Sequence, residues 1–122
     1  MPEQTYKVQY DAFLTSYKAG STTGEQVGEQ IAKMAQWFAS QNTILSIATI
    51  TYAKTTAEFE QRVDENGKQL SSTKAGKLAE ATQEASEYVT AKMHVQNVEQ
   101  IINALKSLQK GVLQEYSHLG GQ

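Results

Sequence analysis

Two histidines, His94 and His118, are the side chains in this sequence best suited to proton transfer or metal binding near neutral pH. A metal site carried by one helix needs a second ligand one turn away from the first. Positions 90 and 98, one turn to either side of His94, hold threonine and valine, and His118 lies close to the end of the chain. The spacing therefore predicts no metal site and favours a surface or interface position for His94.

The acidic residues, serines and glycines do not form a local catalytic signature. Carboxylate pairs such as Glu84 and Glu87 have the spacing of solvated helix faces. The glycines between positions 20 and 28 are not followed by the Lys-Ser or Lys-Thr pair of a phosphate-binding loop. The absence of cysteine excludes disulfides and thiolate ligands. We therefore expect a protein that is not an enzyme and that needs no cofactor, metal or small-molecule substrate.

Aromatic and basic side chains are interleaved near the N-terminus, as they are in sites that bind single-stranded nucleic acid. Lys7, Tyr10 and Lys18 are the candidates there for stacking on bases and neutralising phosphates. A second interpretation is that the aromatic residues form the buried face of a helix. Steps of four, three and four favour this second interpretation, because they match one helix face: Tyr6, Tyr10, Phe13 and Tyr17.

Lys68, Lys74 and Lys77 form a second, looser basic patch. These lysines either contact phosphates or keep their part of the chain hydrated. The whole chain has a net charge of -2, so no global positive field attracts nucleic acid, and DNA binding would depend on such local patches.

The stretch Val95–Tyr116 indicates how these side chains are positioned. It contains no proline, and its apolar residues stand at 95, 98, 102, 105, 112 and 116, the spacing of one helix face. We predict a helix over about 73–117, with possible N-caps at Ser71, Ser72 and Thr73.

A second long helix is predicted over about 25–62, because apolar residues recur at helical spacing on more than one seam. Either Thr22 with Glu25 or Thr23 with Gln26 has the spacing of a capping box at its start. The run 43–56 is rich in threonine and isoleucine and resembles a strand. We nevertheless predict helix there, since the helical period continues on both sides.

The remaining segments are short. Thr5 is a suitable cap for a helix over about 5–19, and Gly20 is suited to end it. Asp-Glu-Asn-Gly at 64–67 is the strongest turn signal, and the segment 63–72 has room for a small β-hairpin at 63–70. The sequence therefore predicts an all-α protein with one domain over 1–122: a long antiparallel helical hairpin with a short N-terminal helix.

Two helices of such length carry apolar residues on more sides than they can bury against each other. We expect self-association through the surplus, which is Trp37, Ile44, Ile47, Ile101 and Leu108. The alternative is a monomeric three-helix bundle in which the N-terminal helix covers the second seam. No stretch has the length and apolarity of a signal peptide or a membrane span, so we expect a cytoplasmic protein.

The order of segments over roughly 30–116 resembles that of small phage-encoded recombination accessory proteins, the UvsY-like mediators. An aromatic-bearing helix (MAQWFASQNTILSIATITYAK) is followed by a polar turn (DENGKQLSS) and an Ile/Leu-rich helix (NVEQIINALKSLQKGV). The resemblance implies a helical hairpin that forms rings and loads a recombinase onto single-stranded DNA. Prefoldin-like chaperones share the plan, but the segment 64–72 is too short for their strands. The alternative function is a protein-binding inhibitor or adaptor, or a virion component.

Overall fold

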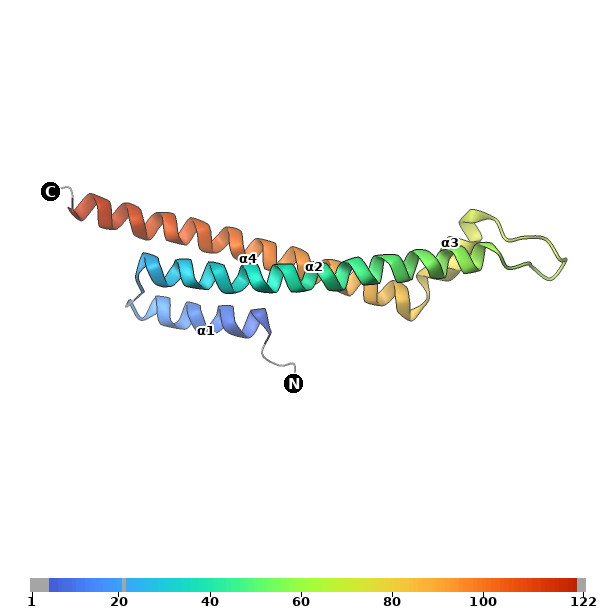
Figure 1. Cartoon of the computed structure of the whole chain (residues 1–122), viewed down its shortest axis with the longest axis horizontal. Coiled ribbons are helices and arrows are strands. Elements are labelled where there is room, and N and C mark those ends of the chain that lie inside the picture. Colours follow the sequence, from blue (N-terminus) through green and yellow to red (C-terminus); the bar gives the residue numbers. More distant parts are fainter. Residues whose placement is uncertain (1–4, 21, 121–122) are drawn as a thin grey trace. The chain divides into compact units, whose positions relative to one another are not determined.

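The computed structural model describes residues 5–20 and 22–120, with side chains up to Gln114. It contains four helices, which are α1 (Tyr6–Lys18), α2 (Gly24–Glu60), α3 (Ser72–Glu80) and α4 (Gln83–Gly120) (Figure 1). The described residues contain no strand, and α2 packs against α4. The prediction of an all-α helical hairpin with a short N-terminal helix is therefore confirmed.

The ends of the first two helices follow local signals in the sequence. The Thr5 hydroxyl accepts a hydrogen bond from the Val8 amide, and Gly20 has a φ of 86° just after α1. At the start of α2, the Gln26 amide donates to the Thr23 hydroxyl, and the Thr23 amide donates to the Gln26 side chain. Of the two capping boxes considered, the one formed by Thr23 and Gln26 is present.

The threonine-rich run at 43–56 is helical, as predicted. Four hydroxyls in this run donate to the backbone carbonyl one turn earlier, at distances of 2.7–3.1 Å. They belong to Thr49, Thr51, Thr55 and Thr56. These bonds satisfy the hydroxyls inside the helix, which offsets part of the lower helix propensity of β-branched residues.

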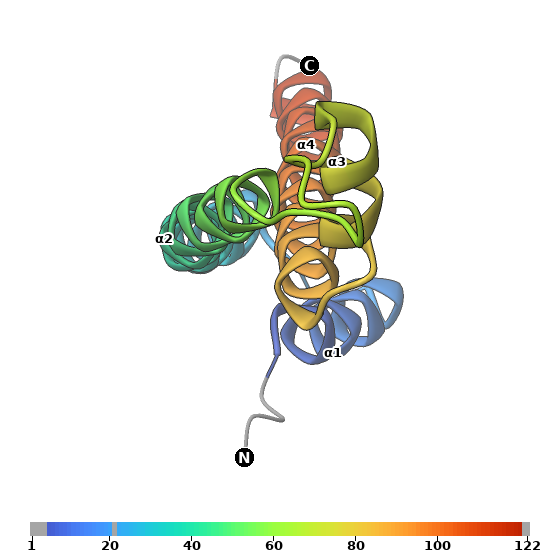
Figure 2. The same ribbon diagram turned by 90° about the vertical axis from the view of Figure 1, so that its right-hand side faces the viewer.

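The connection between α2 and α3 is a tight turn, seen in front of the helices in Figure 2. The Asp64 carboxylate accepts hydrogen bonds from the backbone amides of Asn66 (2.8 Å) and Lys68 (3.0 Å), and Gly67 has a φ of 79°. One antiparallel bridge joins Val63 to Gln69. The hairpin considered from the sequence is therefore limited to this single bridge.

The prediction of one helix over 73–117 is wrong, because the helix is interrupted between the end of α3 and the start of α4. The Thr82 hydroxyl donates to the Ala79 carbonyl (2.6 Å) and accepts from the Ala85 amide (3.2 Å). One side chain therefore satisfies a carbonyl at the end of α3 and an amide at the start of α4. The intervening Ala81 has φ and ψ of -89° and 5°, which do not continue the helix.

The chain divides into two compact units, each built on a different part of α2 and α4. The first unit consists of the chain up to Ala39 and from Gln96 onward. In this unit α1 lies beside the start of α2 (Figure 1). Its core contains the buried side chains of Tyr6, Val27, Met34, Val98 and Leu105. Half-buried Tyr10 and Phe13 of α1 pack against this core, so three of the four residues of the predicted aromatic face contribute to it or contact it.

The second unit spans Ser40–Val95. The rings of Tyr52 and Tyr88 join α2 to α4 here, with centroids 5.3 Å apart. The side chains that are buried in this unit are all alanines, namely Ala75, Ala79, Ala85 and Ala91. Large apolar side chains are exposed instead: Ile44, Ile47, Ile50, Val63, Leu78, Val89 and Met93.

Candidate protein-binding surface

A groove of about 510 Å³ lies between α2 and α4 in the second unit. Its α2 wall is formed by side chains that recur at steps of three or four residues, and Ile44 and Ile47 are the largest of these. The two isoleucines are 48% and 61% exposed. The complete α2 wall consists of Gln41, Ile44, Ile47, Ala48 and Thr51.

The α4 wall combines small side chains with larger polar ones. Ser86, Thr90 and Ala91 are the small ones, while Gln83, Glu87 and His94 are larger, and Glu87 follows Ser86 in the middle of the wall. The small side chains beside the exposed isoleucines leave room for the side chains of another helix. We call this feature, formed by the residues of both walls, the α2–α4 groove.

The α2 wall lies within a stretch that has no acidic, basic or histidine side chain. No Asp, Glu, Lys, Arg or His occurs between Ser40 and Ala53, although much of this helix surface is exposed. The hydroxyls of Thr49 and Thr51 are bonded to carbonyls of their own helix. An exposed helix face that lacks charges and has internally satisfied hydroxyls has the composition of an interface core.

The five residues predicted to form an oligomer interface are divided between the two units. Ile44 and Ile47 line the α2–α4 groove. In the first unit, Trp37 and Ile101 are half-buried against the core, and Leu108 is half-buried as well. The Trp37 Nε1–H donates to Gln9 Oε1 (2.8 Å), and its ring meets the edge of Tyr6 with centroids 6.1 Å apart. Of the five predicted residues, Ile44 and Ile47 are therefore the exposed ones.

The N-terminal candidates for nucleic-acid binding lie on α1. Lys7 and Lys18 are exposed, and Tyr10 is half-buried. Lys7 and Tyr10 line a shallow pocket of about 390 Å³ together with Asp11, whose carboxylate reduces the positive charge available to a phosphate.

The second basic patch lies around the turn of the second unit. Lys68, Lys74 and Lys77 have exposed side chains. The backbone N–H groups of Lys68 and Asn66 lower the pKa of the neighbouring Asp64 carboxyl, and the positive charge of Lys74 adds to this effect. An ionised carboxylate therefore lies beside these lysines.

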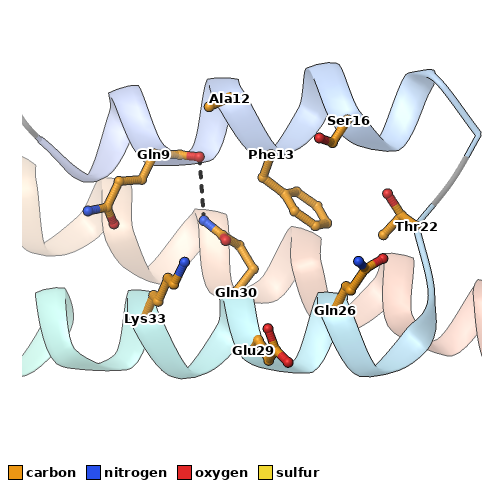
Figure 3. A pocket seen from close by; sticks show the side chains of 9 residues that line it. All are labelled: Gln9, Ala12, Phe13, Ser16, Thr22, Gln26, Glu29, Gln30 and Lys33. Atoms are coloured by element: carbon orange, nitrogen blue, oxygen red, sulfur yellow. Dashed lines mark hydrogen bonds between the residues drawn. The ribbon is translucent and has the colours of Figure 1, made fainter.

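A further pocket of about 400 Å³ lies between α1 and α2 in the first unit. Figure 3 shows the Phe13 ring pointing into it, and the Gln30 side chain donating to the Gln9 carbonyl (3.4 Å). Ser16, the one serine of the lining, has no histidine among its neighbours in this pocket. The lining provides amides and hydroxyls for hydrogen bonding, together with the charged side chains of Glu29 and Lys33.

His94 is half-buried at the rim of the α2–α4 groove. Across the described side chains, no group of three or more His, Cys, Asp or Glu residues has the geometry to hold a metal ion. In the same part of the chain, no helix is long and apolar enough to cross a membrane.

Ser86, Thr90 and Ala91 are among the groove residues that the sequence did not point to. Small side chains are common on helix faces, so their types alone gave no signal.

Comparison with protein families, curated proteins and solved structures finds no match for this chain. The functional argument therefore depends on the geometry described above.

Proposed function

We propose that this chain is a non-enzymatic helical module that works by binding protein through the α2–α4 groove. The observation that supports this proposal is that the second unit buries small apolar side chains and exposes large ones. Its buried side chains are alanines, while Ile44 and Ile47 are 48% and 61% exposed on a stretch of α2 without Asp, Glu, Lys, Arg or His. Placing such side chains in contact with a partner removes their apolar area from water, at roughly 25 cal/mol per Å². An adaptor, an inhibitor or a structural component of a virion would each use such a surface.

The test is the double substitution Ile44→Lys and Ile47→Lys. Because both side chains are exposed, we expect the variant to keep the helix content of the parent by circular dichroism and to melt within a few degrees of it. We also expect it to lose association, measured as mass by light scattering, or the binding of an apolar dye if the parent is a monomer. Loss of helix content would contradict the proposal, because it would show that the isoleucines hold the monomer together.

Val89→Lys is the matched control. Val89 is 63% exposed on α4 and does not line the groove. A charge at this position tests whether any lysine on an exposed apolar site has the same effect. Equal loss of association in Val89→Lys would mean that the groove is not the binding surface.

A second candidate function is binding of single-stranded DNA, the role implied by the resemblance to phage recombination mediators. The observation that favours it is the pocket in which Lys7 lies beside Tyr10, with the Asn97 and Gln100 amides in the same lining. A base could stack on the tyrosine while the lysine contacts a phosphate. Five carboxylates and four basic side chains lie between positions 58 and 80, however, so the turn region does not form a positive field.

A salt titration with a labelled oligonucleotide tests this second function. Binding that weakens as salt rises, and that weakens again in Lys7→Gln, would support it. The triple substitution Lys68→Gln, Lys74→Gln and Lys77→Gln tests whether the lysines around the turn contribute to oligonucleotide binding. No binding at low salt by micromolar protein would exclude a DNA role.

A further inference from the structure

We infer that the partner in the α2–α4 groove is a second copy of this chain, and that Ile44 and Ile47 of each copy lie on the small side chains of α4 in the other. This inference rests on the proposed function and identifies its partner. The result is an isologous pair in which two α2–α4 surfaces face each other as a four-helix bundle.

The first argument is self-complementarity. In a two-fold dimer the same patch must provide both the protruding and the receiving groups. The groove provides both: Ile44 and Ile47 protrude from the α2 wall, while Ser86, Thr90 and Ala91 leave space on the α4 wall. A groove made for a different protein needs only the receiving side, and its rim need not carry exposed isoleucines.

The second argument concerns charge. Two identical surfaces that approach each other bring like charges together wherever a charged residue lies near the symmetry axis. The stretch from Ser40 to Ala53 brings none. On the opposite wall, Glu87 is the one acidic residue, and no lysine or arginine lines the groove. Each copy thus brings a single carboxylate to the paired surface, which limits like-charge repulsion and provides few charges with which to select a different partner.

The third argument is the role of α1 in the first unit. There the pair of α2 and α4 is covered by α1, whose Tyr6 is buried in the shared core and whose Tyr10 and Phe13 pack against that core. In the second unit the buried side chains of α3 are two alanines, and the isoleucines of α2 stay exposed. A helix from a second copy would provide the apolar side chains that α1 provides in the first unit.

The size of the groove determines how strongly we expect the two copies to bind each other. The α2 wall from Gln41 to Thr51 is about 15 Å long at 1.5 Å per residue. The groove involves fewer side chains than the roughly 20–30 residues per partner of a standard interface. We therefore expect a dimer with a Kd on the order of micromolar.

Light scattering over a concentration series reaching about 100 µM tests the pairing, because this range exceeds the expected Kd. We expect the mass to rise from one copy to two, and Ile47→Lys to raise the Kd by at least about tenfold. Val89→Lys should change it by less than about twofold, since surface changes outside a contact have small effects.

Cysteine cross-linking tests the geometry, and the absence of native cysteine makes each introduced thiol unique. Ile47→Cys and Thr90→Cys are made in separate chains, mixed and oxidised. We expect a disulfide between the two chains in this mixture, and much less of it when Val89→Cys replaces Thr90→Cys. Equal cross-linking in the two mixtures would overturn the arrangement.

A monomer throughout the concentration series would overturn the inference. Dye binding by the same samples then tests the proposed function separately. A monomer that binds an apolar dye in a manner removed by Ile44→Lys and Ile47→Lys leaves the groove available for another protein. A monomer that binds no dye removes the support for both.

Discussion

The two units of this chain bury different kinds of side chain, although both are built from α2 and α4. The first unit fully buries Val27, Met34, Val98 and Leu105. Each such side chain contributes roughly 1.5–3 kcal/mol of burial free energy. The second unit buries alanines, which contribute much less because an alanine has a single methyl group. Hydrophobic stabilisation is therefore concentrated in the first unit.

The difference shows what holds the second unit in its fold. It fully buries no large apolar side chain, and its helices are joined by the contact of Tyr52 with Tyr88 and by hydrogen bonds at its ends and turns, such as those of Asp64 and Thr82. It also retains apolar side chains that a partner can cover. The first unit thus contains the large buried side chains, and the second presents the exposed apolar side chains that we propose as an association surface. The predictions below test this division, beginning with the largest expected effect.

Leu105→Ala tests the core of the first unit. Leu105 is fully buried, so the change should lower the free energy of unfolding by about 2–5 kcal/mol. Urea denaturation followed by circular dichroism measures it. Ile47→Ala, at a concentration where the chain is monomeric, should cost less than about 1 kcal/mol because that side chain is 61% exposed. Equal costs for the two changes would break the comparison.

Gly67→Ala tests the turn of the second unit. An L-residue at a φ of 79° is strained by roughly 1–2 kcal/mol, and we expect this loss in the free energy of unfolding. The control is Gly76→Ala in α3, where a new Cβ meets no atom within 4 Å. That change should stabilise the protein by roughly 0.5–1 kcal/mol, because alanine is a better helix former. A neutral Gly67→Ala would mean that the turn does not support the second unit.

Gln9→Ala tests the polar contact at the edge of the first core. It removes the acceptor for the Trp37 Nε1–H, so we expect a loss of about 0.5–1.5 kcal/mol in urea denaturation. Gln36→Ala, an exposed glutamine on α2, should change stability by less than about 0.5 kcal/mol. Equal effects of the two changes would show that this hydrogen bond contributes nothing.

The pH dependence of the turn is the smallest effect. The amides of Lys68 and Asn66 lower the pKa of Asp64 below its usual value near 3.8. A lowered pKa favours the folded turn above the unfolded pKa, and this contribution is lost as the pH falls through the folded pKa. Nuclear magnetic resonance of the Asp64 carboxyl carbon should give a midpoint below 3.8. A midpoint at or above this value would contradict the hydrogen bonds described here.

The helices and most of their ends could be predicted because their signals are local. Thr5, Gly20, Thr23 and Ser71 act at the positions where their side-chain chemistry is expected to act. The break at Thr82 was missed because alanine, not glutamate, stands three residues later, so no capping box marks the start of α4.

The candidate surface could be predicted only in part. Periodicity identified a surplus of apolar side chains on α2, which includes Ile44 and Ile47. It did not show which members of the surplus would be covered, because that depends on where the short α1 lies. Contacts with residues distant in the sequence, such as that of Trp37 with Gln9, determine which side chains are covered, and such contacts have no local sequence signal.

The position of Trp37 has a practical consequence for studying this chain. It is the one tryptophan in the sequence, and its indole lies edge-on to Tyr6 within the first unit. Intrinsic emission excited at the red edge of the absorption band therefore reports on that unit alone, while Tyr52 and Tyr88 of the second unit are silent. A melting curve recorded by this emission, overlaid on one from far-ultraviolet ellipticity, would reveal whether the halves of α2 lose their structure together.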